Sequence, residues 1–318
     1  MSDKQNYEVA PGINYEYVYV ARTDSTKPTL FFLHGFPSSL HCWRHQIQYF
    51  STQGYGCLAP NLMGYGKTHS PLDKNEYRMK SMVAHLMRLL DHLKLDRVVV
   101  VGHDWGTRPA TRIILYHPER TLGLVLISVG YKPPKRFNLD EALAFLKQML
   151  GYESMGYWEF FNADDAASLL ESNADSFIDI GYTDDPRLWI TDFAPLGKLR
   201  DWITHGKRTR RASYLTEDDY RVIRQCVTEG IEPKLNWYRS TIAELDWEDE
   251  KELNPTIRRP VLYIGGAKDY VCIPKLYASQ KQDIPTLETV EMDTGHWVME
   301  EKPNEVNQAI ANWAKALH

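Results

Sequence analysis

Short apolar runs and amphipathic stretches alternate along the first 130 residues of the chain. Runs of strand length, apolar or alternating, occupy residues 15–20, 29–33, 56–59, 98–101 and 122–127. Amphipathic stretches with helical spacing separate several of them, at residues 43–50, 78–93 and 108–117. Because strand and helix alternate, we predict an α/β fold of the α/β-hydrolase type, with a mostly parallel central sheet flanked by helices.

The pattern changes after residue 132. Residues 133–254 are rich in aromatic and acidic side chains and contain helical stretches such as 139–149 and 217–227, but no convincing buried strand. Strand-like and helical runs resume after this segment, at residues 260–264, 287–292 and 304–316. We therefore predict a core in two parts with a helical cap inserted between them, divided as 1–132, 133–254 and 255–318.

Composition and charge narrow the location and the partners. Charged residues make up 25% of the chain and the net charge is −5, which gives no electrostatic reason to expect a nucleic acid or a membrane surface as partner. No apolar run approaches the roughly 18 residues that span a bilayer. Residues 1–7 lack a secretory signal pattern, so we expect a cytoplasmic protein without a membrane span.

The cysteines and one basic run carry no metal or anion signature. Four cysteines lie far apart without C-x-x-C spacing, at Cys42, Cys57, Cys226 and Cys272. We therefore expect reduced, mostly buried thiols, with neither a zinc site nor disulfides. Residues 207–211 (KRTRR) have acidic neighbours inside the cap, and we expect a solvated loop there rather than an anion site.

The most specific chemistry lies in residues 102–106, GHDWG. Four valines at 98–101 lead into this stretch, and the helical pattern of 108–117 follows it. Asp104 is therefore predicted to lie on a sharp strand-to-helix turn, and the flanking glycines suit the backbone angles and close approach that such a turn requires. This is the spacing of a nucleophile elbow, with a carboxylate where serine usually stands.

Two further reactive groups follow later strands. Asp269 comes after the run at 260–264, and His296 comes after the run at 287–292. Open α/β sheets bind ligands at the carboxyl ends of their strands, and nucleophile, acid, histidine is the chain order of α/β-hydrolase triads. No Asp or Glu occurs in residues 121–135 to offer another acid. We therefore predict a catalytic triad of Asp104, Asp269 and His296.

An aspartate nucleophile favours alkyl transfer. Serine attacking an sp3 carbon would leave an ether that water does not readily cleave, whereas a carboxylate leaves an ester that an activated water can hydrolyse. Asp104 is ionised at neutral pH because the ordinary pKa of Asp is about 3.9, and His296, oriented by Asp269, can deprotonate the water. The predicted oxyanion-hole donors are the backbone N–H groups of Phe36 and Trp105.

Epoxides and alkyl halides both suit a carboxylate nucleophile, but their leaving groups differ. An epoxide opens to an alkoxide, which needs a proton or a strong hydrogen bond, whereas a halide needs only weak N–H donors. A neutral tyrosine hydroxyl, with an ordinary pKa of about 10, can donate to the alkoxide. The choice between the two substrates therefore depends on tyrosines in the cap.

Short motifs in a fixed order mark nearly the whole chain. They are HGFP at 34–37, GYG at 64–66, GHDWG at 102–106, NWYR at 236–239, and GHW at 295–297 continuing to KPNEVNQ at 302–308. Through them the chain resembles the soluble epoxide hydrolases of the α/β-hydrolase fold. The resemblance implies conversion of an epoxide and water to a vicinal diol, without cofactor or metal. Only residues 1–33 precede the first motif, so the chain resembles the shorter plant and microbial forms without the N-terminal phosphatase domain of the animal enzymes.

The resemblance also implies a set of substrate-contacting residues. Two cap tyrosines hold the epoxide oxygen in that family: the NWYR motif places one at Tyr238, and the run at 156–161 (GYWEFF) places the other at Tyr157. A cis peptide bond before Pro37 is part of the family pattern. Aromatic cap residues are expected to shape the substrate pocket, namely Trp158, Phe160 and Trp189.

Three alternatives stay open at this point. A haloalkane dehalogenase would share Asp-Trp at the elbow, but such enzymes often carry Asn where Phe36 stands and lack the NWYR tyrosine. Fluoroacetate dehalogenases share HGFP but place Arg after the nucleophile, where this chain has Trp105. A ligand receptor on a hydrolase scaffold would need neither the full triad nor the tyrosines, although a fold by itself does not specify turnover.

Overall fold

One eight-stranded sheet forms the centre of the molecule in the computed structural model, which describes residues 3–317. The strands lie side by side in the order β1-β2-β4-β3-β5-β6-β7-β8. Their bounds are β1 (Gln5–Ala10), β2 (Ile13–Val20), β3 (Thr29–Leu33), β4 (Gly56–Pro60), β5 (Val98–His103), β6 (Thr121–Ile127), β7 (Val261–Gly266) and β8 (Leu287–Met292).

The sheet is parallel from β4 to β8, which confirms the prediction from the alternation of strand and helix. Strands β3 and β5 are buried along their whole length, because helices cover both faces of the sheet. Strands β1 and β2 form an antiparallel edge. The hydrophobic pattern does not predict β1, since its sequence QNYEVA is mostly polar and exposed.

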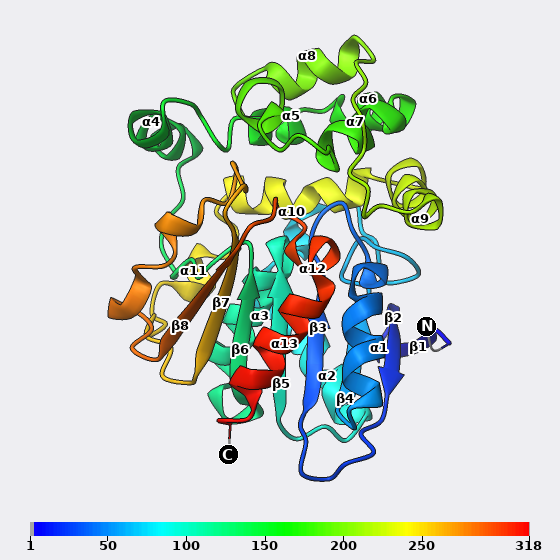
Figure 1. The fold of residues 1–318 in the computed structure, drawn as a ribbon, viewed down its shortest axis with the longest axis vertical. Helices are drawn as coiled ribbons and strands as arrows, with labels where there is room; N and C mark the ends of the chain where they lie inside the picture. The colour runs from blue at the N-terminus through cyan, green and yellow to red at the C-terminus, as the bar shows by residue number, and fades with distance from the viewer. Residues whose placement is uncertain (1–2, 318) are drawn as a thin grey trace.

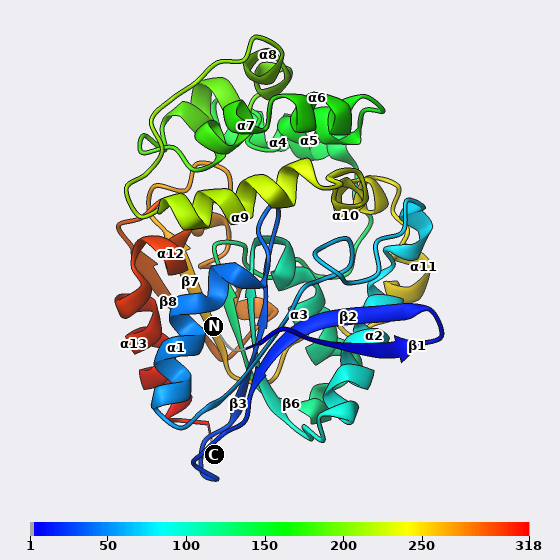
Figure 2. The same ribbon diagram turned by 90° about the vertical axis from the view of Figure 1, so that its right-hand side faces the viewer.

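Helices form two layers on the sheet and a third layer above it. Figure 2 shows α1, α12 and α13 on one face of the sheet and α2 and α3 on the other. The helices are α1 (Arg44–Thr52), α2 (Met79–His92), α3 (Thr107–Tyr116), α4 (Leu139–Leu150), α5 (Tyr157–Asn162), α6 (Ala166–Ser172), α7 (Ala174–Gly181), α8 (Lys198–Thr204), α9 (Glu217–Thr228), α10 (Glu232–Ile242), α11 (Trp247–Glu250), α12 (Val298–Glu301) and α13 (Pro303–Ala314).

The third layer is made of α4 to α10, which lie over one end of the sheet (Figure 1). These helices and α11 fall between β6 and β7, two strands that pair directly in the sheet. The layer is therefore an insertion between neighbouring strands. Helix α11 lies outside it, because Glu250 is paired with Arg112 of α3 on the core. The limits of the cap at residues 133 and 254 stay a prediction from the sequence.

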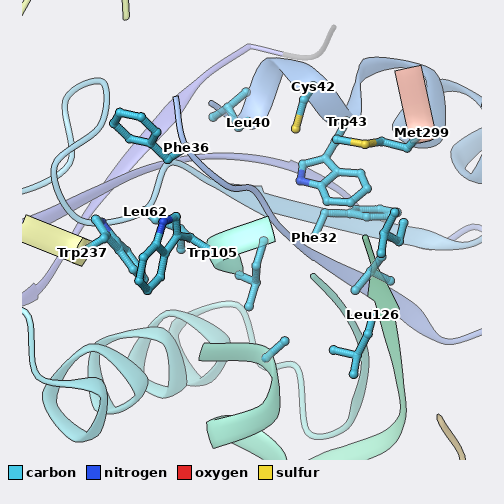
Figure 3. Packing of buried hydrophobic residues seen from close by; sticks show 14 of the residues in the cluster. Phe32, Phe36, Leu40, Cys42, Trp43, Leu62, Trp105, Leu126, Trp237 and Met299 are labelled. Atoms are coloured by element: carbon cyan, nitrogen blue, oxygen red, sulfur yellow. The ribbon is translucent and has the colours of Figure 1, made fainter. Parts of the chain in front are cut away.

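Buried aromatic side chains join the core to the cap layer (Figure 3). Trp43 packs on Phe32 of the central strand β3, with ring centroids 5.1 Å apart. Trp105, at the elbow, packs on Trp237 of α10 with ring centroids 6.0 Å apart. The floor formed by the strand ends and the cap above it thus share one continuous apolar cluster, which fixes α10 over the elbow.

The basic run lies in a mostly exposed loop, and three of the four cysteines are buried, as the sequence predicts. Residues 207–211 form a loop between α8 and α9, where Lys207 pairs with Asp201 at 2.7 Å and Arg208 with Asp179 at 2.5 Å. All four cysteines are free thiols. Among the described residues, no helix combines the length and the apolar character needed to cross a bilayer.

The buried ion pair between Arg112 and Glu250 gives a test of how the cap segment returns to the core. Two hydrogen bonds of 2.7 Å join the guanidinium to the carboxylate, and both residues are almost fully buried. We expect Arg112→Met to lower the free energy of unfolding by about 3–5 kcal/mol, because Glu250 is left as an unpaired buried charge. Denaturant unfolding followed by tryptophan fluorescence measures the loss.

The double variant Arg112→Met/Glu250→Leu is the matched control for this test. It removes both charges and keeps apolar volume, so we expect it to regain most of the lost stability. A double variant as unstable as Arg112→Met alone would contradict the account.

Candidate active site

Asp104 lies at the tip of a sharp turn between β5 and α3. Its backbone is in the left-handed region, with φ at +50°, a conformation that costs a non-glycine residue of the order of 1–3 kcal/mol. The turn leaves no room for side chains on either side. A Cβ on Gly106 would lie 2.1 Å from the carbonyl oxygen of Leu33, and one on Gly102 would lie 2.6 Å from the carbonyl of Gly106. The elbow predicted from GHDWG is therefore present.

The structure brings together the three predicted triad residues. His296 Nε2 lies 3.6 Å from Asp104 Oδ2, and His296 Nδ1 lies 2.7 Å from Asp269 Oδ2. The other oxygen of Asp269 accepts hydrogen bonds from the backbone N–H groups of Val271 and Cys272, at 3.0 and 2.8 Å. Asp269 thus closes a local turn with one oxygen and orients the imidazole with the other.

Sequence reasoning missed three side chains that fix the loop carrying His296. The carbonyl oxygen of His296 accepts hydrogen bonds from Ser128 Oγ at 2.6 Å and from His103 Nε2 at 3.1 Å. The preceding N–H, of Gly295, donates to both carboxylate oxygens of Glu301 at 3.0 Å. These residues come from β5, the end of β6 and α12, and no spacing in the sequence links them.

The charges of the triad support one another. Burial alone would lower the pKa of His296, but the charge of Asp269 and hydrogen bonding to the flanking carboxylates hold that pKa well above its ordinary value. Burial alone would raise the pKa of Asp104, but the facing imidazole of His296 keeps it below the ordinary value. Burial lowers the pKa of His103 to about 3, so this neighbouring ring is neutral and can donate to the His296 carbonyl through a protonated Nε2.

The predicted oxyanion-hole donors lie next to the nucleophile. The N–H of Phe36 donates to Asp104 Oδ1 at 2.9 Å. Trp105 follows Asp104 in a short 3-10 helix, Asp104–Gly106, and N–H groups in the first turn of a helix have no partner within that helix. The Phe36–Pro37 peptide is cis, as the family pattern implies.

A cavity between the elbow and the cap contains Asp104, His296, Tyr157 and Tyr238 in its lining. Its empty volume is about 390 Å³, including space open to solvent. The rest of the wall is mostly apolar, with aromatic contributions from Phe36, Phe161, Phe177, Trp189, Phe193 and Trp297. Burial raises the pKa of both tyrosines well above the ordinary value, so their hydroxyl groups stay protonated and can donate hydrogen bonds.

Helix α10 explains why the NWYR motif is contiguous. Successive helical residues point about 100° apart, so four in a row reach four sides. Asn236 Nδ2 donates to the Leu72 carbonyl at 2.9 Å, and Trp237 Nε1 donates to the Met63 carbonyl at 2.9 Å. The guanidinium of Arg239 donates to the Ala163 carbonyl, at the end of α5, at 3.0 Å. The remaining residue, Tyr238, lines the cavity.

Of the three cap aromatics that the sequence places at the pocket, one lines the cavity and two do not. Trp189 lines the cavity, with its ring centroid 5.5 Å from that of His296. Trp158 and Phe160 are not among the lining residues, which corrects the expectation from the sequence. Trp158 packs behind Tyr238, at 5.1 Å between ring centroids, and Phe160 lies under the guanidinium of Arg200. Their positions on α5 turn both side chains away from the wall to which Tyr157 and Phe161 contribute.

Comparison with known proteins identifies relatives over most of the chain. A family model described as the alpha/beta hydrolase fold matches residues 28–303. Epoxide hydrolase 1 of Siraitia grosvenorii is 32% identical over 96% of this chain and 96% of its own length. The bifunctional epoxide hydrolase 2 of Rattus norvegicus is 28% identical over 96% of this chain. The chain spans 54% of that rat protein.

Solved structures of epoxide hydrolases have the same fold as this chain. Epoxide hydrolase A from Mycobacterium thermoresistibile superposes with a TM-score of 0.84 at 25% identity, covering 100% of this chain and 99% of that one. An epoxide hydrolase from Vigna radiata gives a TM-score of 0.81 at 26% identity, with 98% of each chain covered.

The charge coupling in the triad predicts how His296 titrates. Asp104→Asn removes one of the two carboxylates that stabilise the imidazolium, so we expect the pKa of His296 to fall. Imidazole NMR shifts, assigned with a His296→Gln variant, measure the change. His103 is the internal control, because burial keeps it neutral in both proteins above its pKa of about 3. An unchanged His296 pKa would show that Asp104 does not share its charge with the ring.

Proposed function

The chain belongs to the epoxide hydrolases of the alpha/beta hydrolase fold, and we propose that it hydrolyses epoxides to vicinal diols through a covalent ester on Asp104. The observation that carries the proposal is the cavity whose wall contains two neutral tyrosines together with the nucleophile and the histidine. The carboxylate supplies the attack, and the tyrosines supply the proton that an opening epoxide ring needs.

In the first step, Asp104 attacks one ring carbon of the epoxide. The bond from a carboxylate oxygen to carbon forms, and the carbon–oxygen bond of the ring breaks, leaving an alkoxide. The hydroxyl groups of Tyr238 and Tyr157 together hydrogen-bond to that alkoxide, and one of them gives it a proton. The imidazolium of His296 then returns a proton to the tyrosinate, so the ring becomes neutral. The first step therefore ends with an ester on Asp104 and with a neutral His296 that can act as a base.

In the second step, His296 takes a proton from a water that attacks the ester carbonyl. The N–H groups of Phe36 and Trp105 stabilise the oxyanion of the tetrahedral intermediate. The acyl–oxygen bond then breaks, the diol leaves with the proton of the new carboxyl group, and Asp104 is again a carboxylate facing an imidazolium. The protons balance without any cofactor.

Two features of the cavity favour an epoxide over an alkyl halide. The hydroxyl groups of Tyr157 and Tyr238 suit an alkoxide, which requires a proton, better than a halide. Phe36 presents an apolar ring 5.2 Å from the ring of Tyr238, measured between centroids, and offers no side-chain donor to a halide. The aromatic wall also favours epoxides with aryl or alkyl substituents.

Replacing the tyrosines tests their role as proton donors. We expect Tyr238→Phe and Tyr157→Phe each to lower kcat by about 10²–10⁴-fold on aryl and alkyl epoxides, because each change removes a proton donor and keeps the ring. Diol formation is measured with a panel that also contains haloalkanes. Asp104→Ala, which should abolish diol formation, is the control for turnover at this site.

Three results with the same panel would contradict the proposal. Halide release faster than diol formation would assign the site to haloalkanes. If the unmodified protein binds epoxides but forms no diol, it would be a ligand receptor on a hydrolase scaffold and not an enzyme. Diol formation unchanged in both phenylalanine variants would remove the tyrosines from the mechanism.

A further inference from the structure

A third metal-ligating side chain lies beside the acid and the histidine of the triad. The sulfur of Cys272, a carboxylate oxygen of Asp269 and a ring nitrogen of His296 lie within 4.8 Å of one another. All three residues are more than nine-tenths buried. The proposed reaction uses Asp269 and His296 but gives the thiol no part, so the cluster has a binding capacity that the reaction does not require.

These three donors are the types that zinc and softer divalent ions select. Thiolate, imidazole and carboxylate all bind Zn²⁺, and thiolates favour soft ions. Bond lengths of roughly 2.0–2.3 Å place two donors of one tetrahedral ion about 3.3–3.8 Å apart. The Asp269 oxygen and the His296 nitrogen, which lie 2.7 Å apart, would therefore have to separate by about 0.6 Å, and the thiol would have to approach them by up to about 1–1.5 Å. Water from the adjoining cavity can supply a fourth ligand.

Local structure holds the donors together beside the cavity, which His296 lines. The N–H groups of Val271 and Cys272 both donate to Asp269 Oδ1, so Asp269 and Cys272 belong to the same hydrogen-bonded turn. Val271, between them, lines the cavity, as does His296. On the imidazole, Nδ1 is the nitrogen that faces Asp269, at 2.7 Å from Oδ2. An ion shared by these groups therefore takes the place of the Nδ1 proton.

We propose that Asp269, Cys272 and His296 Nδ1 form an inhibitory site for a thiophilic divalent cation such as Zn²⁺ or Cd²⁺. Its kinetic effect rests on the proposed epoxide hydrolysis. Binding forms metal–oxygen, metal–sulfur and metal–nitrogen bonds, and it releases the thiol proton and the Nδ1 proton of the imidazolium to solvent. No electron transfer is involved.

The geometry makes the inhibition specific for one step. With the cation on Nδ1, the remaining ring proton is on Nε2, the nitrogen 3.6 Å from Asp104. That nitrogen has no lone pair to accept a proton from water, so ester hydrolysis stops. Attack by Asp104 needs no base, and a tyrosine gives the alkoxide its proton, so the ester still forms. A proton from solvent, instead of one from His296, then restores the tyrosine. A cation-loaded protein should consume one equivalent of epoxide and hold it on Asp104.

Calorimetry and thiolate-to-metal charge-transfer absorption with Cd²⁺ test the site without reference to activity. We expect Cys272→Ala to weaken Cd²⁺ binding by at least about 100-fold, the upper range for losing even an outer-shell partner of a metal. Cys226→Ala, which removes a thiol on the cap helix α9, is the matched control and should bind Cd²⁺ like the unmodified protein. Equal binding by all three proteins, or no binding, would overturn the site.

Mass spectrometry of the Asp104 peptide tests the step. With saturating Cd²⁺ and excess epoxide, we expect turnover to fall by at least about 100-fold and a substrate adduct to accumulate on Asp104, as it should in His296→Gln. A chelator should then release one equivalent of diol. Inhibition without an adduct would overturn binding at Nδ1. Absence of diol from every epoxide in metal-free protein would instead contradict the proposed function, while the calorimetric result would still decide the site.

Discussion

The position of His296 between two carboxylates is the interaction on which the candidate site depends. Asp269 holds one side of the ring at 2.7 Å, and Asp104 faces the other side at 3.6 Å. Both carboxylates favour the imidazolium over the neutral ring. In the proposed reaction, ester formation removes the charge of Asp104, and the pKa of His296 falls as a result. The ring thus becomes a base only after the nucleophile has reacted.

This coupling requires several parts of the chain to meet with little freedom. The left-handed backbone of Asp104 is held by glycines that allow the elbow to touch the loop after β3. The backbone around His296 is fixed by Ser128, His103 and Glu301, which belong to three other segments. Since a misplacement of about 1 Å can slow a reaction by about 10²-fold, this framework is the structural basis of the proposed chemistry.

The cap adds what the core lacks. Helices α5 and α10 bring Tyr157 and Tyr238 over the nucleophile, with ring centroids 6.1 Å apart. Around them the wall is aromatic, so the hydroxyl groups are kept neutral by burial. A donor that stays protonated at neutral pH suits an alkoxide leaving group, and this is the physical reason for favouring epoxides.

The parts that the sequence predicts are those with a local signal. The parallel strands read as apolar runs, and Asp104 is marked by adjacent glycines. Chain order and the positions of the strand ends predict Asp269 and His296. Contacts between distant segments leave no such signal: Glu301 and Ser128 support His296 without any motif. The sequence does not place Trp158 and Phe160 correctly, because a composition rich in aromatics does not specify which face of α5 meets the cavity.

A single turnover in oxygen-18 water tests the central claim, the ester on Asp104, most directly. With protein in excess over epoxide, attack of water on the ester carbonyl leaves oxygen-18 in the carboxylate of Asp104. The diol of that turnover takes its new oxygen from the protein and is unlabelled. Label in the Asp104 peptide and none in the first diol is the result expected here. Label in the first diol, with none in Asp104, would mean that water attacks the epoxide directly and that no ester forms.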